Sequence, residues 1–185
     1  MIDGGKALAA GVKRVFGATA AVARCTIHKT RNATDHLPAE LRPGLRRRLV
    51  KAFANPDAAA GLAAAKALAA ELDKAGHQDA AASLREGLDD MFTVTRLGVS
   101  AALARSLSST NIIESMIATA KATMGNVKRW QDPAMIRRWT VAAMLNAERG
   151  FRRVKGGKEM AVLVAALKAR VAAAEKKAQA DALVA

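Results

Sequence analysis

The sequence is poor in the residues that build β-sheets and covalent cross-links. It has no tyrosine, aromatic residues make up only 3%, and Cys25 is its single cysteine. One cysteine excludes an intramolecular disulfide and suits a reducing cytoplasm. No apolar run approaches the ~20 residues of a membrane span, and the first residues lack the basic-then-apolar layout of a signal peptide. We therefore expect a cytoplasmic protein with no membrane partner.

What the chain has instead is alanine, which supplies much of its 51% apolar content. Alanine loses no side-chain entropy in a helix, whereas strands favour branched and aromatic residues, so we predict a mainly α fold. Asn55-Pro56-Asp57 indicates a stop and restart, with Pro56 suited to the first turn of the next helix. Apolar spacing, caps and breakers predict one short strand within residues 20–26, and helices over residues 6–16, 46–53, 58–75, 77–92, 111–124, 134–149 and 158–177.

Positive charge is the other dominant feature, with a formal net charge of +14. Residues 1–60 carry 11 Lys/Arg against 4 Asp/Glu, residues 61–110 carry 5 against 6, and residues 111–185 carry 14 against 6. Two basic segments therefore flank a nearly neutral one. Such a balance favours a polyanionic partner, most often nucleic acid, although solubility or a GC-rich genome would also produce it.

Three separated segments carry the most specific patterns in the chain. They are RCTIHKTRN at residues 24–32, SSTNIIESM at residues 108–116, and the basic stretch 126–155, which contains NVKRW and ERGFRRVK. In this order they resemble the Mutator-type transposases of bacterial insertion sequences. The resemblance extends from about Asp3 to about Lys158, and we expect that only the C-terminal portion of such an enzyme is present.

The resemblance implies a fold class and a division of the chain. The chain would be mainly α, the C-terminal remnant of an RNase H-like α/β catalytic domain that holds a helical insertion. Residues 1–28 would form the tail of the RNase H-like core, with an Asp turn, a helix and a strand. The other expected segments are the helical insertion (29–107), a Glu-bearing helix with basic helices (108–157) and a C-terminal Ala/Lys-rich helix (158–185).

The chemistry implied by the resemblance is DNA transposition through metal-dependent phosphoryl transfer. Such a reaction uses two divalent cations roughly 4 Å apart, and Mg²⁺, or Mn²⁺ in its place, is held by carboxylates. Asp3 matches the second Asp of the family's three carboxylates, and Glu114 matches the Glu, within a motif that includes Asn111. No residue here matches the first Asp, and Ile112 stands where these transposases typically have proline. From residue type alone, a turn Asp and a Glu in a first helical turn are the simpler interpretations.

Cys25 and His28 have a spacing that occurs in zinc sites, but a tetrahedral site needs four ligands. His36 and His77 are the only other histidines and there is no second cysteine, so we expect no structural zinc. In the related transposases a Cys/His pair follows the second Asp, and only that position is implied here. A buried cysteine and a hydrogen-bonded histidine would satisfy the pattern equally well.

Basic residues fall into two clusters that we expect to contact the DNA backbone, since phosphate contacts release counterions and give affinity without sequence information. Trp130 and Trp139 are candidates for stacking on an unpaired base, although helical spacing favours a core position. The candidate DNA-binding residues are Arg46, Arg47, Arg48, Lys128, Arg129, Trp130, Arg137, Arg138, Arg152, Arg153 and Lys155.

The function expected from the sequence is therefore that of a partial DNA transposase. Its partners would be the element ends and the target DNA, and the chain would be inactive alone because one carboxylate is missing. The alternative is a non-catalytic basic helical protein that binds nucleic acid or pairs with an intact transposase and inhibits it. A homo-oligomer formed through the last helices is compatible with either.

Overall fold

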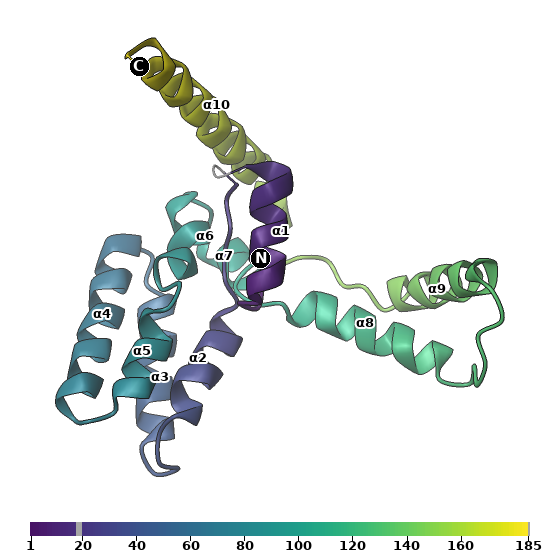
Figure 1. Ribbon diagram of the computed structural model, residues 1–185, viewed down its shortest axis with the longest axis horizontal. Coiled ribbons are helices and arrows are strands. Elements are labelled where there is room, and N and C mark those ends of the chain that lie inside the picture. The colour runs from purple at the N-terminus through teal and green to yellow at the C-terminus, as the bar shows by residue number, and fades with distance from the viewer. Residues whose placement is uncertain (18–19, 185) are drawn as a thin grey trace. The chain divides into compact units, whose positions relative to one another are not determined.

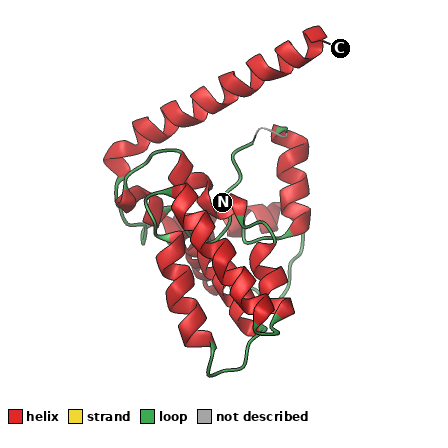
Figure 2. Ribbon diagram, turned by 90° about the vertical axis from the view of Figure 1, so that its left-hand side faces the viewer, coloured by secondary structure: helices red, strands yellow, loops and turns green. Residues whose placement is uncertain are grey.

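The computed structural model describes residues 1–17 and 20–184, and the side chains of these up to residue 176. The chain divides into two compact units, Met1–Ser109 with Lys155–Ala185, and Thr110–Val154. Within the described residues all regular elements are helices, as Figures 1 and 2 show. The prediction of a mainly α chain is confirmed, and the RNase H-like remnant stays a prediction.

Four helices form the body of the first unit: α2 (Thr26–Asp35), α3 (Arg42–Phe53), α4 (Ala58–Lys74) and α5 (Gln78–Arg85). Each packs against two of the others in the cycle α2, α3, α4, α5 (Figure 1). The apolar side chains that they and the following segment enclose include Leu45, Leu49, Leu68, Leu84 and Phe92. The ring centroids of Phe53 and Phe92 lie 5.9 Å apart, with the rings tilted by 59°. Leucines at helical spacing thus form the core between the four helices.

Local signals explain where the bundle's helices begin and end. The Asp57 carboxylate accepts hydrogen bonds from the backbone nitrogens of Ala59 and Ala60 at 2.8 and 3.1 Å, so Asp57 is the N-cap of α4. Pro56 therefore precedes the cap, and its predicted place in the first turn is wrong. Gly61 allows α4 to approach α3 closely. A Cβ at this position would lie only 2.7 Å from the carbonyl oxygen of Ala52 in α3.

The predicted helix over residues 77–92 is interrupted. α5 ends at Arg85, and Gly87 turns the chain with a positive φ of 62° before the 3₁₀ helix η1 (Asp89–Phe92). Glycine adopts that conformation without steric cost, which the periodicity of leucines does not reveal. Two further short helices were not predicted, α6 (Thr93–Arg96) and α7 (Ala101–Ser106).

The N-terminal segment joins the bundle through backbone hydrogen bonds. The nitrogen of Ile2 donates to the carbonyl oxygen of Ala23, and the nitrogen of Cys25 donates to the carbonyl oxygen of Ile2, both at 2.8 Å. This makes one isolated parallel bridge between Ile2 and Arg24. The predicted strand within 20–26 is wrong as far as the described residues go, because a ladder needs more than one paired residue. Between these segments lies α1 (Lys6–Phe16), which ends as predicted before Gly17.

The second unit is a hairpin of α8 (Asn111–Met124) and α9 (Pro133–Glu148) (Figure 1). Small side chains lie between the two helices, where Ala120, Ala143 and Ala147 are buried. The amide nitrogen of Asn146 donates to the hydroxyl of Thr123 at 2.9 Å. Asp132 caps α9 by accepting from the backbone nitrogen of Met135 at 2.6 Å, so the predicted start at Asp132-Pro133 is confirmed.

After the hairpin the chain returns to α7. The Ser106 hydroxyl donates to the carbonyl oxygen of Lys155 at 3.0 Å, and the backbone nitrogen of Ser100 donates to the Glu159 carboxylate at 3.0 Å. Gly156 lies so close to Leu103 that a Cβ would contact its backbone nitrogen at 2.6 Å. The 3₁₀ helix η2 (Gly157–Glu159) and α10 (Met160–Val184) follow. Within residues 1–17 and 20–184, no helix is long and apolar enough to span a membrane.

Candidate functional site

Asp3, the first candidate carboxylate, lies in an exposed turn of the first unit. Its Oδ1 accepts a hydrogen bond from the backbone nitrogen of Gly5 at 2.9 Å. The bridge of Ile2 with Arg24 fixes the residue immediately before it. The turn predicted from Asp3-Gly4-Gly5 is confirmed.

Arg24 holds this turn against the bundle. Its side chain is only 8% exposed, and its Nη1 lies 3.0 Å from both the carbonyl oxygen and the Oε1 of Glu86. Gly4 and Gly87 enclose the guanidinium, and a Cβ on either residue would clash with it. Both glycines have positive φ, 108° and 62°. Arg24 thus positions the Asp3 turn through packing rather than by touching the carboxylate.

Lys29 joins Arg24 on the same carboxylate. Its Nζ donates to the carbonyl oxygens of Ser83 and Glu86, at 2.7 and 2.6 Å, and to Glu86 Oε2 at 2.9 Å. The hydrogen bond from Arg24, followed by that from Lys29, lowers the pKa of Glu86 to about 2. Burial lowers the pKa of Lys29, although its hydrogen bond with Glu86 opposes this shift. Two buried cations therefore share one half-exposed carboxylate, which keeps Glu86 ionised.

Several residues of the motif 24–32 have a structural role in this cluster around Glu86. Cys25 is a buried free thiol, and His28 is partly buried on α2. Arg24 and Lys29 belong to the motif, but their pairing with Glu86 was not predicted, because Glu86 lies some 60 residues away in an unremarkable helix end. Among the described residues no three His, Cys, Asp or Glu side chains gather closely enough to hold a metal ion. The expectation of no structural zinc stays a prediction.

Glu114, the second candidate carboxylate, lies in the first turn of α8 in the second unit. Its side chain is exposed and accepts a hydrogen bond from the Thr110 hydroxyl. Thr110 occupies the predicted N-cap position, but its side chain does not cap a backbone nitrogen. Asn111 is the exposed first residue of the helix, and Ile112 continues it without distortion.

The two carboxylates fit a divalent cation by the chemistry of their donors. Carboxylate oxygens are the side-chain ligands that Mg²⁺ prefers, and both side chains are exposed. The backbone fixes each one locally, Asp3 by the Ile2 bridge and Glu114 by its helical turn. Asp3 belongs to the first unit and Glu114 to the second.

The basic residues predicted to contact DNA are all exposed, but they differ in their partners. On α3, Arg48 donates two hydrogen bonds to the Glu71 carboxylate at 2.6 and 2.8 Å, so its guanidinium is already paired. Arg46 and Arg47, its neighbours, make no ion pair with a described residue. These two present unneutralised charge on the same helix.

Residues 110–154 of the second unit contain eight Lys/Arg and three Asp/Glu. All eight cations are exposed, and none forms an ion pair within the described residues. Trp130 and Trp139 are 42% and 36% exposed, so the core position favoured by the helical spacing is wrong for both. The cations of this unit are Lys121, Lys128, Arg129, Arg137, Arg138, Arg149, Arg152 and Arg153.

Comparison with protein-family models matches residues 1–153 of the 185 to the transposase family described as "Transposase, Mutator family". Comparison with curated proteins and with solved structures gives no match. The matched range contains both candidate carboxylates, the Arg24–Glu86 pair and the helical hairpin. Because this match covers well over half of the sequence, the chain belongs to the Mutator family of transposases.

Proposed function

We propose that this chain takes part in DNA transposition and recombination, holding DNA on the hairpin of residues 110–154 and contributing Asp3 and Glu114 to a catalytic centre. The observation that carries the proposal is the set of eight exposed cations in residues 110–154, none of which forms an ion pair within the described residues. Exposed Lys and Arg without carboxylate partners are free to neutralise phosphates, and this releases condensed counterions from DNA.

Asp3 and Glu114 would hold Mg²⁺, or Mn²⁺ in its place. When bound, such ions activate the attacking oxygen and stabilise the leaving oxygen of a phosphoryl transfer. Arg24 keeps the Asp3 turn in place through Gly4 and Gly87, while the first turn of α8 orients Glu114. Two carboxylates are fewer than a two-metal centre usually uses, so we propose that a third comes from outside residues 1–185.

The first experiment measures DNA binding as a function of salt. Fluorescence anisotropy with a labelled duplex should give a binding constant whose logarithm falls linearly with the logarithm of salt concentration. Replacing Arg137, Arg138, Arg152 and Arg153 with glutamine should reduce the steepness of this dependence by about 0.9 for each lost phosphate contact. The double variant Lys66→Gln/Lys74→Gln removes exposed cations from α4 as a control. An equal effect of both sets of changes would contradict the proposal.

The second experiment separates catalysis from binding. DNA carrying the element's terminal repeats is incubated with Mg²⁺ or Mn²⁺ and a transposase that contains residues 1–185, either wild type or Glu114→Gln. We expect strand cleavage by the wild type, loss of cleavage in the variant, and unchanged DNA affinity. Binding without cleavage by the wild type would leave a non-catalytic role, in which the chain holds DNA or inhibits an intact transposase.

A further inference from the structure

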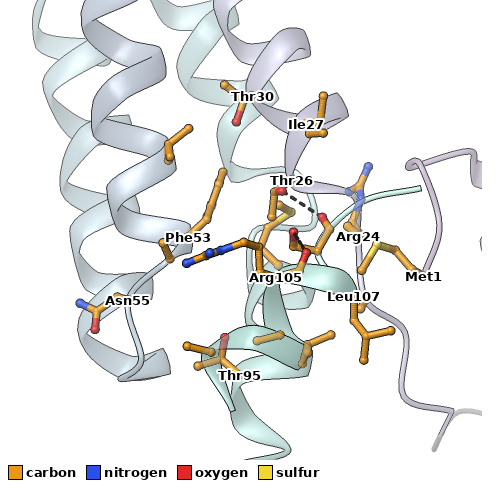
Figure 3. Close-up of a pocket in the computed structure, with 18 of the residues that line it drawn as sticks. Met1, Arg24, Thr26, Ile27, Thr30, Phe53, Asn55, Thr95, Arg105 and Leu107 are labelled. Atoms are coloured by element: carbon orange, nitrogen blue, oxygen red, sulfur yellow. Dashed lines mark hydrogen bonds between the residues drawn. The ribbon is translucent and has the colours of Figure 1, made fainter. Parts of the chain in front are cut away.

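The first unit contains a cavity of about 600 Å³ whose lining includes neither candidate carboxylate. It lies between α2, α3 and the segment of residues 91–108 (Figure 3). All of its lining residues belong to the first unit. Its volume is in the range of about 300–1,000 Å³ that small-molecule sites usually have.

The walls of the cavity are mostly apolar. Phe53 from the end of α3 and Ile27 from α2 face it, together with residues from the segment after α5. Uncharged polar residues also line it, among them Thr26, Thr30, Asn55 and Thr95 (Figure 3). The larger apolar side chains of the lining include Ile27, Val50, Phe53, Met91, Val94, Val99 and Leu107.

Arginine is the charged residue type of this lining, which includes no aspartate or glutamate. Arg24 is paired with Glu86, but Arg31, Arg46 and Arg105 make no side-chain hydrogen bond or ion pair with a described residue. These three come from different helices, α2, α3 and α7. In Figure 3 the Arg105 side chain extends toward Phe53. An apolar space bordered by three unneutralised cations suits a ligand that is flat and apolar in one part and anionic in another.

We infer that this cavity binds an unpaired nucleotide of DNA, with the base against the apolar walls and the flanking phosphates on Arg31, Arg46 and Arg105. A base presents a π-face to apolar and aromatic side chains whatever its identity, and Arg pairs with phosphate in a bidentate geometry. Thr95 and Asn55, whose Oδ1 already accepts a hydrogen bond from the backbone nitrogen of Asp57 at 2.9 Å, are polar residues near the base edge. The inference rests on the proposed function, since it takes DNA as the partner, and adds that the strand is locally unpaired.

The test compares a perfect duplex with a duplex that carries one bulged 2-aminopurine, whose fluorescence reports its environment. We expect the wild-type chain to bind the bulged duplex about 5- to 150-fold more tightly, the range expected for one stacked base, and to change the 2-aminopurine signal. Ala104→Trp fills the cavity from α7, so it should remove this preference while leaving affinity for the perfect duplex unchanged. Ala60→Trp, on the exposed side of α4 and outside the cavity, is the matched control.

A second pair of variants keeps the proposal testable if Ala104→Trp fails to fold in a thermal melt. Arg46 lines the cavity and its exposed neighbour Arg47 does not. Arg46→Gln should reduce the preference for the bulged duplex, whereas Arg47→Gln should weaken both duplexes equally or not at all. Equal effects of the two substitutions on that preference would overturn the inference.

The remaining outcomes separate the two proposals. Tight, salt-sensitive binding of the perfect duplex with no preference for the bulge would overturn the cavity assignment and leave the proposed function intact. Binding of neither duplex would overturn both. An acidic amphipathic peptide that binds the wild type but not Ala104→Trp, in the absence of any bulge preference, would identify the cavity as a protein-docking site and also overturn the inference.

Discussion

The α2–α5 bundle and the α8–α9 hairpin use the same kinds of residue in opposite ways. In the bundle and the segment after it, leucines and Phe92 are buried, and some of the cations form ion pairs, as in Arg48 with Glu71 and Arg96 with Asp89. In the hairpin the buried residues are alanines, while Ile112, Ile136 and Leu145 are 59%, 47% and 56% exposed. The hairpin cations have no ion-pair partner among the described residues.

This difference separates a part that is stable through its own contacts from a part shaped for contact with something else. Burial of apolar surface is the main favourable term in folding, and the bundle satisfies it internally. A surface that combines exposed apolar side chains with unneutralised charge is typical of an interaction site. The bundle thus supplies most of the internal apolar contacts, the hairpin is shaped mainly for contact with a partner, and the cavity beside α2 and α3 is the part of the first unit that we infer takes part in recognition.

Loss of a large apolar side chain should give the largest difference between the two regions. Phe92→Ala removes a fully buried ring and should lower the free energy of unfolding by about 3–5 kcal/mol. Ile113→Ala, on the exposed face of α8, should change it by no more than about 0.5 kcal/mol. Urea denaturation followed by circular dichroism measures both. Similar losses in the two variants would contradict the division.

A smaller loss in the free energy of unfolding is expected from removing the carboxylate that pairs with the buried cations Arg24 and Lys29. Glu86→Gln leaves Arg24 and Lys29 without a carboxylate. Removing one partner of a buried pair costs about 3–5 kcal/mol, but Glu86 is half exposed, so we expect a loss of about 1–3 kcal/mol after screening. Arg48→Gln, which breaks a pair at the surface, is the control and should have little effect.

The same carboxylate predicts how stability responds to acid. The pKa of Glu86 is about 2 in the folded chain against a usual value of 4.5, so the unfolded chain binds the proton more readily. The stabilisation from Glu86 is therefore complete above pH 4.5 and is lost as the pH falls from 4.5 toward 2. Urea midpoints of the wild type and Glu86→Gln should differ at pH 7 and converge in that interval. A constant difference from pH 7 to pH 2 would exclude this origin.

The smallest effect concerns the contact that ties α8 to α9. Asn146 donates to Thr123 at the hairpin surface, and Asn146→Ala should cost at most about 1 kcal/mol. Hydrogen exchange should detect faster opening of residues 110–154 with no change in the bundle. Faster exchange in α2–α5 would show that the two units unfold together.

Elements bounded by strong local signals could be predicted from the sequence. Gly17, Gly76 and Asp132 mark the ends of α1, α4 and α9 through steric freedom or capping. α2 was missed because its buried positions include Lys29, Thr30 and Thr34, which show no apolar period. The break at Gly87 was missed for a related reason, since the leucine spacing continues through it.

Of the candidate site, only the residues that match the family's motifs could be predicted from the sequence. Asp3 and Glu114 come from the resemblance, and their local settings, a turn and a first helical turn, are as expected. Glu86 could not be predicted as the partner of Arg24 and Lys29, because that contact depends on how α5 packs against α2. The cavity is formed by segments far apart in the sequence, so no local pattern indicates it.

The place where the chain leaves α7 and returns to it has a consequence for how this sequence can change. Ser106 donates a hydrogen bond to the carbonyl oxygen of Lys155, and Gly156 lies against Leu103. The residues that precede and follow 110–154 therefore lie close together in the first unit. The entropy of closing such a loop grows only slowly with its length. Residues 110–154 can therefore lengthen, shorten or acquire a different surface during evolution while the first unit, which carries Asp3, keeps its fold.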